Sequence, residues 1–388
     1  MVSDQLYISL HLFLPVLILL DYYERMIIFL VVISLFFLTR VDGTPSYWVY
    51  GCQPGNVSSA LRFCDYKLSV VDRVDNLLSL LTLDEKLGIL GADKNYDDIT
   101  CEMIDHGVKR LGIPHYMNLV ETNSAVASAC IEDGKCATNF PSPAAFASSF
   151  NRSLWLKKGQ IMSDEMRALN NYNWYRGTND GSGAEHISKL GLTGYGPNIN
   201  LMRDPRWGRN SEVPSEDPIL SGEYGSHMVK GMQEGSDPNY IKVISGLKHF
   251  MAYSVEEHRE TFIPNITTFD LWDTYLMQYK IGFAKEATME GYMGGNAHGV
   301  MSSYSGMNGV PACSNEFIIT DVLRGAWERD DVVVATDCGA ISNSINYQGY
   351  ATSDQDAAAK ALNAGTDLDL GDDYFQTREN GGNGGDAC

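Results

Sequence analysis

The chain has 388 residues, of which 44% are hydrophobic, which suffices for a large packed core and excludes disorder over most of its length. Lysine and arginine together number 29 and aspartate and glutamate 49, so the formal net charge is -20. This charge, with no basic cluster to offset it, excludes nucleic acid as a partner. The acidity otherwise indicates a solvated surface and says nothing about a substrate.

The N-terminal part, residues 1–43, is typical of a targeting region. Residues 26–39, MIIFLVVISLFFLT, form an apolar run that is too short for an ordinary membrane span of about 20 residues and suits the core of a secretory signal peptide. A second apolar stretch, residues 8–20, lies upstream. Either translation begins at Met26, or the two stretches form a membrane anchor. The signal-peptide interpretation predicts a secreted, extracellular protein.

The cysteines and glycosylation triplets agree with secretion. All eight cysteines follow the apolar region, and an even number behind a signal permits disulfides. Cys130 and Cys136 flank a turn-like segment and form the best local pair, while the other pairings stay open. Acceptor triplets for N-glycosylation begin at Asn56, Asn151 and Asn265, which predicts a glycoprotein.

The body of the chain alternates between short apolar runs and longer amphipathic ones. Helical spacing predicts a helix from residue 69 and a second helical pattern from Asp84 to about residue 90. The predicted strands are 114–119, 144–150, 196–201, 243–250, 300–304, 332–336 and 366–370, and the predicted helices are 154–169, 221–233, 271–288 and 318–327. This alternation indicates a parallel α/β fold, and about seven strands over roughly 300 residues favour a (β/α)8, TIM-like barrel over an open sheet.

The tail differs in composition from the body. From Gly381 the chain reads GGNGGDAC, a glycine-rich stretch that cannot pack a core. We therefore expect three parts: residues 1–43 as signal peptide or anchor, 44–371 as the barrel, and 372–388 as a glycine-rich tail that indicates truncation.

Several predicted strands end in polar or charged residues, at the edge that forms the active-site face of a barrel. Residues 243–247 lead to Lys248 and His249, residues 300–303 to Tyr304, and residues 332–336 to Asp337. A carboxylate directly after five small or β-branched residues is a catalytic candidate. The alternatives are that Asp337 caps the next helix and that Lys248 and His249 lie on an ordinary surface.

A loop at residues 203–210, RDPRWGRN, contains three arginines and a tryptophan. Arginine offers a planar fork of donors to hydroxyls and tryptophan offers a face to a sugar ring. The alternative is a loop latched by arginine–carboxylate pairs with Asp204, Glu212, Glu216 or Asp217. No metal-binding or nucleotide-binding motif is present, and we expect no cofactor.

Ordered motifs between about residues 110 and 371 resemble the N-terminal barrel domain of glycoside hydrolase family 3. They are ATNFP at 137–141 with ASSFN at 147–151, GPNIN at 196–200, RDPRWGR at 203–209 with SEDP at 215–218, KHF at 248–250, SYSGMNGVP at 303–311, and TDCGA at 336–340. One motif alone would be weak, but six in order are a specific signal.

The resemblance implies a role for each candidate. Asp337 falls at the position of the nucleophile, and Tyr304 at that of the tyrosine beside it. Lys248, His249 and Arg209 fall at positions that bind hydroxyls of the sugar in subsite -1. Positive charge on Lys248 and Arg209 would favour the ionised form of the nucleophile.

Glu121, which ends the run YMNLVE at 116–121, matches a sugar-binding carboxylate of the family. That position is usually Asp in the β-glucosidases and Glu in the plant and fungal β-xylosidases. The extra methylene would narrow the space for the hydroxymethyl group of glucose. The resemblance therefore implies a retaining, exo-acting hydrolase of β-linked oligosaccharides, close to the β-xylosidase/α-arabinofuranosidase branch and to xylan breakdown, with a β-glucosidase as the alternative.

The resemblance fails for the acid/base residue. Most family members carry a second α/β sandwich domain that supplies it, whereas this chain continues only briefly past Leu370. One-domain members use an Asp-His dyad on the loop after KHF, where this chain has Glu257 and His258 without the expected pattern. Three interpretations stay open: a truncated two-domain hydrolase, a short protein that binds sugar or turns over slowly, and a one-domain enzyme with an unusual acid/base. The first predicts an exposed apolar patch on the barrel.

Overall fold

The computed structural model describes residues 51–91 and 105–371, apart from 54, 106, 115, 128–129, 131–133, 177–190 and 289. The expected signal or anchor region (1–43) and the glycine-rich tail (372–388) lie outside the described residues. The described residues belong to one compact unit, which spans 48–388. No helix among them is long and apolar enough to cross a lipid bilayer.

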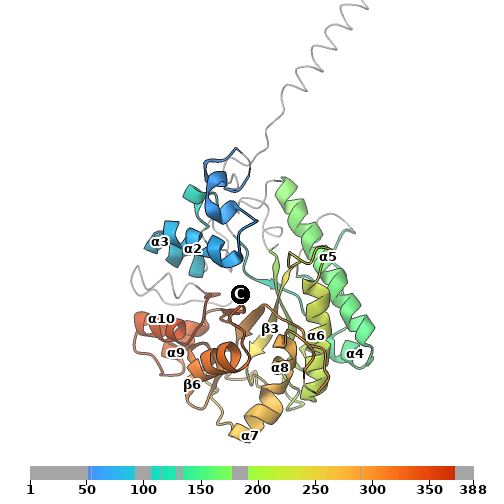
Figure 1. Cartoon of the computed structure of the whole chain (residues 1–388). Coiled ribbons are helices and arrows are strands. Elements are labelled where there is room, and N and C mark those ends of the chain that lie inside the picture. The colour runs from blue at the N-terminus through green and yellow to red at the C-terminus, as the bar shows by residue number, and fades with distance from the viewer. Residues whose placement is uncertain are drawn as a thin grey trace, which may run out of the picture. The chain divides into compact units, whose positions relative to one another are not determined.

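A parallel sheet of five short strands lies at the centre, in the order β1-β2-β3-β4-β7 (Figure 1). The strands are β1 (Val120–Glu121), β2 (Thr193–Asn198), β3 (Ile244–Phe250), β4 (Gly299–Ser302) and β7 (Val333–Ala335). Parallel bridges from Ala335 to Leu368 and from Asp369 to Gly91 continue the sheet beyond β7. Because the strands are parallel, the side chains that follow them meet at one edge.

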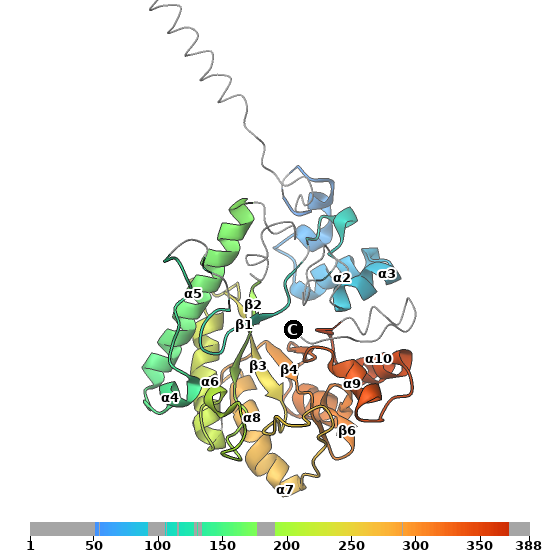
Figure 2. The same ribbon diagram turned by 180° about the vertical axis from the view of Figure 1, so that it is seen from behind.

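Helices cover the sheet on two sides. They are α4 (Pro143–Ala147), α5 (Arg152–Arg176), α6 (Pro218–Gln233), α7 (Thr268–Asp270), α8 (Met277–Phe283), α9 (Ala340–Asn346) and α10 (Asp354–Asn363), with wider turns in η5 (Leu271–Tyr275) and η7 (Phe317–Ala326). Figures 1 and 2 show α4, α5 and α6 on one side of the strands and α9 and α10 on the other. A short hairpin, β5 (Gly306–Met307) and β6 (Val310–Pro311), precedes η7.

Most predicted elements are confirmed in kind, and the predicted strand 144–150 is wrong. Residues 144–147 belong to α4 and a turn follows them, because Ser142 caps the helix by accepting from the N–H of Ala145 at 3.4 Å and Pro143 suits its first turn. The predicted strand 114–119 is also wrong as bounded, since the pairing to β2 involves Val120 and Glu121.

Other predicted boundaries shift. The strand predicted at 196–201 begins three residues earlier, as β2, and residues 366–370 contribute single bridges to the sheet. The helix predicted at 271–288 is divided into η5 and α8, and ends at Phe283. The strands predicted at 243–250, 300–304 and 332–336 are confirmed to within two residues as β3, β4 and β7. The helices predicted at 154–169, 221–233 and 318–327 are confirmed in kind as α5, α6 and η7, but α5 continues to Arg176 and α6 begins earlier, at Pro218.

Two glycines let β2 approach the segment after β1. A Cβ on Gly194 would lie 2.7 Å from Cγ2 of Thr122, and one on Gly196 would lie 2.6 Å from its carbonyl oxygen. Real side chains do not tolerate such distances, so any larger residue here would push the two strands apart. The glycines thereby hold the ends of β1 and β2 together at the edge where the candidate site lies.

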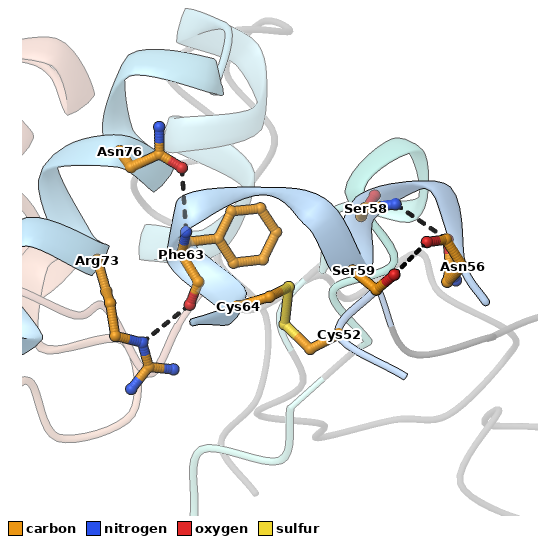
Figure 3. Close-up of a disulfide and its surroundings, with 8 residues drawn as sticks. All are labelled: Cys52, Asn56, Ser58, Ser59, Phe63, Cys64, Arg73 and Asn76. Carbon is orange, nitrogen blue, oxygen red and sulfur yellow. Dashed lines mark hydrogen bonds between the residues drawn. A yellow bond between two sulfur atoms is a disulfide. The ribbon is translucent and has the colours of Figure 1, made fainter. Parts of the chain in front are cut away.

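A disulfide-tied layer of short helices precedes the sheet. The Cys52–Cys64 disulfide closes its first turns (Figure 3). The backbone of Phe63 donates to Oδ1 of Asn76 at 3.0 Å and accepts from Nε of Arg73 at 2.9 Å, both on α2 (Val70–Leu80). The two predicted helical patterns are confirmed as α2 and α3 (Leu83–Leu90). The predicted Cys130–Cys136 disulfide is also present.

Helix α2 carries an exposed apolar stripe. Val70 and Val71 are 71% and 68% exposed, and Val74 and Leu78 are 45% exposed on the same helix. Leu77 and Leu80 of the same helix pack against the cluster around Phe63. The truncated-chain interpretation predicted an exposed apolar patch on the barrel. The stripe lies on the N-terminal helices and not on the barrel, so it does not test that prediction.

Candidate active site

The structure brings the six predicted site residues together at the carboxyl edge of the sheet. Each follows or ends a strand: Glu121 ends β1, Arg209 lies on the loop after β2, Lys248 and His249 lie near the end of β3, Tyr304 follows β4, and Asp337 follows β7. Their interactions show how the edge is built.

Lys248 carries a buried amine that binds Glu121. Its Nζ lies 2.6 and 2.5 Å from the two carboxylate oxygens, and its side chain is 2% exposed whereas that of Glu121 is half-exposed. A buried ammonium without a partner is costly, so this contact fixes both side chains. The Glu121 carboxylate therefore faces the edge with oxygens left to accept from a ligand.

Arg209 binds Glu212 through two parallel hydrogen bonds. Its Nε lies 3.0 Å from Oε1 and its Nη2 lies 2.7 Å from Oε2, and its Nη1 donates to the Tyr253 hydroxyl at 3.4 Å. Burial alone would raise the pKa of Glu212, but the hydrogen bonds and charge of Arg209, with the charge of Lys248, outweigh it and lower that pKa. Glu212 therefore stays ionised beside the site.

Asp337 is buried next to His249. The Nε2 of His249 lies 3.7 Å from Oδ2 of Asp337. The backbone N–H of His249 donates to Oδ1 of Asn200 at 2.7 Å. Burial, followed by the charges of Lys248 and Arg209, lowers the pKa of His249 well below its usual value. The imidazole is therefore neutral near pH 7 and can donate from one nitrogen and accept at the other.

The balance of charges at Asp337 differs from the expectation. Burial raises its pKa, and the charge of Lys248, the N–H of Cys338 and the charge of Arg209 lower it, as expected for the two cations. Burial outweighs these effects, so the pKa of Asp337 is raised overall. A carboxylate held in this way is poorly solvated and surrounded by donors.

The helix-cap interpretation of Asp337 is wrong. Helix α9 begins at Ala340 with Gly339 as its cap residue, in the left-handed conformation with φ 68°, and no side chain caps it. The Asp337 carboxylate instead accepts from the N–H of Cys338 at 2.9 Å.

Tyr304 lies beside Asp337 and is covered by Arg259. Burial and then the negative charge of Asp337 raise the pKa of the Tyr304 phenol, and the Arg259 guanidinium lies 4.4 Å from the centre of the Tyr304 ring. Arg259 also donates to the Tyr253 hydroxyl at 3.1 Å and to Glu256 at 2.8 Å. This cluster forms one wall of the site.

Sequence reasoning missed these wall residues. Tyr253, Glu256 and Arg259 lie on the loop after KHF, where Glu257 and His258 were considered as substitutes for the acid/base. The side chains of Glu257 and His258 are 89% and 81% exposed, which favours the alternative of solvated loop residues. The presence of three polar residues in so short a loop could have indicated a role in the site. Their orientation toward the site, however, depends on contacts with residues outside the loop.

The arginine-rich loop is latched, as the alternative interpretation held. Arg206 binds Asp204 through contacts of 2.5–3.2 Å while its side chain points to solvent. Trp207 is buried, donates from Nε1 to Glu256 at 3.2 Å and packs edge-on against Tyr253. The prediction that Trp207 offers a face to a sugar is therefore wrong, because the indole fills the wall of the loop.

Known proteins share this fold and part of this sequence. Residues 181–379 match the glycosyl hydrolase family 3 N terminal domain. The chain belongs to this family. It is 37% identical over 340 residues to β-D-xylosidase 3 of Arabidopsis thaliana and 37% identical over 329 residues to β-xylosidase/α-L-arabinofuranosidase 1 of Medicago sativa subsp. varia, covering 84% and 81% of this chain. It spans 39% and 38% of those relatives.

Solved structures of the family share the fold. A family 3 exo-β-xylosidase in complex with a xylobiose aziridine probe superposes with a TM-score of 0.67 at 32% identity, over 83% of this chain and 38% of that one. β-Glucosidase 3B of Thermotoga neapolitana superposes with a TM-score of 0.60 at 26% identity, over 79% and 38%. The fold is thus the α/β, TIM-like barrel of the family's N-terminal domain.

Replacing the buried carboxylate should stabilise the protein. The pKa of Asp337 in the folded state is raised above its ordinary value of 3.8. Between these two pKa values the folded state binds more protons than the unfolded state, so the free energy of unfolding falls as pH rises through this range. Asp337→Asn should therefore unfold at a higher temperature than the unchanged protein at pH 7, and the gain should shrink towards pH 3. Thermal unfolding across this pH range measures it. A variant less stable at every pH would contradict the charge balance described here.

Proposed function

We propose that this chain forms the nucleophile-bearing barrel of a secreted, retaining glycoside hydrolase that removes β-linked xylose from non-reducing ends of oligosaccharides. The observation that carries the proposal is the position of Asp337 after β7, buried beside His249 and Tyr304. Around it lie a lysine, an arginine and a second carboxylate that can bind sugar hydroxyls. The xylosidase and arabinofuranosidase names of the relatives support the substrate class.

In this mechanism Asp337 attacks the anomeric carbon. The bond from that carbon to the leaving oxygen breaks through an oxocarbenium-like transition state, and a glycosyl ester forms on the carboxylate. Burial favours the attack because the poorly solvated anion gains by forming the neutral ester. Tyr304 and His249 orient the carboxylate, and Lys248, Glu121 and Arg209 hold the ring by its hydroxyls.

The leaving oxygen needs a proton from a second carboxyl group about 5–5.5 Å from the first. The carboxylates nearest the described site suit this poorly. Glu212 is held ionised by Arg209, and Glu121 is bound to Lys248. Glu256 accepts from Tyr253 at 2.6 Å and from Arg259. We therefore propose that the acid/base comes from residues outside the described ones.

The preference for xylose is proposed to depend on Glu121. Its two oxygens are both within 2.6 Å of Lys248, so the longer side chain is held at the edge and cannot swing away. The added methylene then occupies space that the hydroxymethyl group of glucose would need. The structural likeness to a β-glucosidase keeps glucose as the second candidate.

A secretory route is supported by the covalent chemistry of the chain. Cys52–Cys64 and Cys130–Cys136 are disulfides, which form in oxidising compartments. Two of the three glycosylation triplets begin at exposed asparagines, Asn151 and Asn265. Together with the apolar run at 26–39 they favour secretion and glycosylation.

A substrate with a good leaving group should isolate the nucleophile from the acid. With 2,4-dinitrophenyl β-xyloside, which needs little proton assistance, the folded chain should release about one equivalent of dinitrophenolate in a burst. Stopped-flow absorbance measures this, and Asp337→Ala should abolish it. Absence of a burst from folded protein would mean that the barrel alone does not carry out the first step.

Shortening the selectivity residue should change the sugar preference. Glu121→Asp should lower the ratio of the xyloside burst rate to that of the matching glucoside by about tenfold, since one methylene in a pocket is worth roughly 1–3 kcal/mol. Glu121→Gln is the control, because it keeps the length and should slow both sugars. An unchanged ratio in Glu121→Asp would exclude this residue as the source of selectivity.

Expression in a secretory host should yield a glycosylated product. The chain should be recovered from the medium, and removal of N-glycans should lower its mass. Asn265→Gln and Asn151→Gln should each remove one glycan, as read by mass spectrometry. Retention in the cell with no change in mass on deglycosylation would count against the secretory route.

A further inference from the structure

A buried lysine on α5 contacts the segment that follows β1 and takes no part in the proposed mechanism. The side chain of Lys158 is 1% exposed. Its Nζ donates to the carbonyl of Asn123 at 2.7 Å and to the hydroxyl of Tyr224 at 2.9 Å. The rings of Phe146, Phe140 and Tyr224 surround it at 5.2–5.7 Å. Among the described residues, Lys158 thus contacts a carbonyl, a phenol and three aromatic rings, and it forms no ion pair with a carboxylate.

This placement is costly. Burial lowers the pKa of Lys158 to about 7, because the surroundings solvate the ammonium less well than water does. An apolar side chain of similar length would fill the space without this cost. The buried amine therefore lowers the free energy of unfolding. What it offers in return is its hydrogen bonds to Asn123 and Tyr224.

Asn123, whose carbonyl accepts from Lys158, connects two parts of the site: the segment that carries Glu121 and the turn that carries Arg209 and Glu212. We call these the Glu121 wall and the Arg209–Glu212 wall. Asn123 lies two residues after Glu121, on the segment that leaves β1. Its Nδ2 donates to the carbonyl of Glu212 at 2.9 Å, and its Oδ1 accepts from the N–H of Asn198 at 3.2 Å. One side chain thus fixes the end of β2 and the short turn η4 (Asn210–Glu212) that follows Arg209.

We propose that Lys158 and Asn123 are positioning residues that set the Glu121 wall of the sugar site against the Arg209–Glu212 wall. Lys158 anchors the backbone of Asn123 from the core, and the Asn123 side chain carries that anchor to η4 and β2. Within the described part of the chain, neither side chain forms a hydrogen bond or ion pair with Asp337. They act by fixing the distance between the groups that bind the sugar. The effect on sugar affinity rests on the function proposed above.

The proposal separates positioning from stability. Lys158→Met should keep or raise the unfolding temperature, because it removes a buried amine, yet it should loosen η4 and the segment after β1. Asn123→Asp keeps the acceptor for Asn198 and loses the donor to Glu212, so it should loosen η4 alone. Lys157→Met, at the neighbouring exposed position, is the matched control and should change neither property.

Backbone hydrogen exchange without any sugar tests the positioning directly. Peptides covering residues 207–214 should exchange faster in Lys158→Met and in Asn123→Asp than in the unchanged protein and the Lys157→Met control. Peptides covering residues 119–124 should exchange faster in Lys158→Met. Peptides from α6 should be unaffected. Equal exchange rates in 207–214 for both variants and the control would overturn the proposal.

Xylose binding by calorimetry then tests the consequence. Both variants should bind about tenfold more weakly, the effect of losing roughly one well-placed hydrogen bond, although Lys158→Met is no less stable. Undiminished affinity in a variant with loosened η4 would overturn the link from positioning to binding. If the unchanged protein bound no xylose, the proposed function would fail, while hydrogen exchange would still decide the positioning.

Discussion

The pairing of Lys248 with Glu121 is the interaction on which the site depends. It joins the ends of β1 and β3 across β2, and it places a positive charge where water cannot reach it. That charge acts on the pKa of Asp337, Glu212 and His249 alike. Without it, Asp337 would have less support for its ionised form and Glu121 would have no fixed orientation.

Burial and charge work against each other throughout this edge. Asp337 is desolvated more strongly than its cations compensate, whereas Glu212 is held ionised by Arg209. Two carboxylates of the same site therefore differ in protonation tendency through their surroundings alone. The result is one poorly solvated carboxylate, suited to the proposed attack on carbon, and others that are bound to cations.

The parts of the site that the sequence predicts are those that follow regular strands. Asp337 and Lys248 each lie at the end of an apolar run, so their common edge follows from the alternation of strands and helices. The strand prediction for residues 144–150 was wrong because a short apolar run fits a strand or a buried helix equally well, and the cap at Ser142 decides between them. The prediction that Trp207 faces a sugar was wrong because the burial of its indole depends on Glu256 and Tyr253, over 40 residues away in the chain.

The positioning roles of Lys158 and Asn123 could not be predicted from the sequence for the same physical reason. A lysine in an amphipathic helix normally faces solvent, and only the packing of α5 against α6 and the segment after β1 shows otherwise. Contacts that join α5, α6, the segment after β1, the end of β2 and η4 leave no local pattern in the sequence. The motifs that carry the family resemblance therefore predict the groups proposed to touch the sugar, and not those that hold them in place.

We expect the described barrel to assemble a working nucleophile at Asp337. Treatment with 2,4-dinitrophenyl 2-deoxy-2-fluoro-β-xyloside tests it most directly, because the fluorine slows hydrolysis of the glycosyl ester and the leaving group needs little proton assistance. Mass spectrometry of peptides should find one fluoroxylosyl group, on Asp337. Labelling at another carboxylate would show that Asp337 is not the nucleophile. Absence of labelling on folded protein would show that the barrel alone does not assemble one.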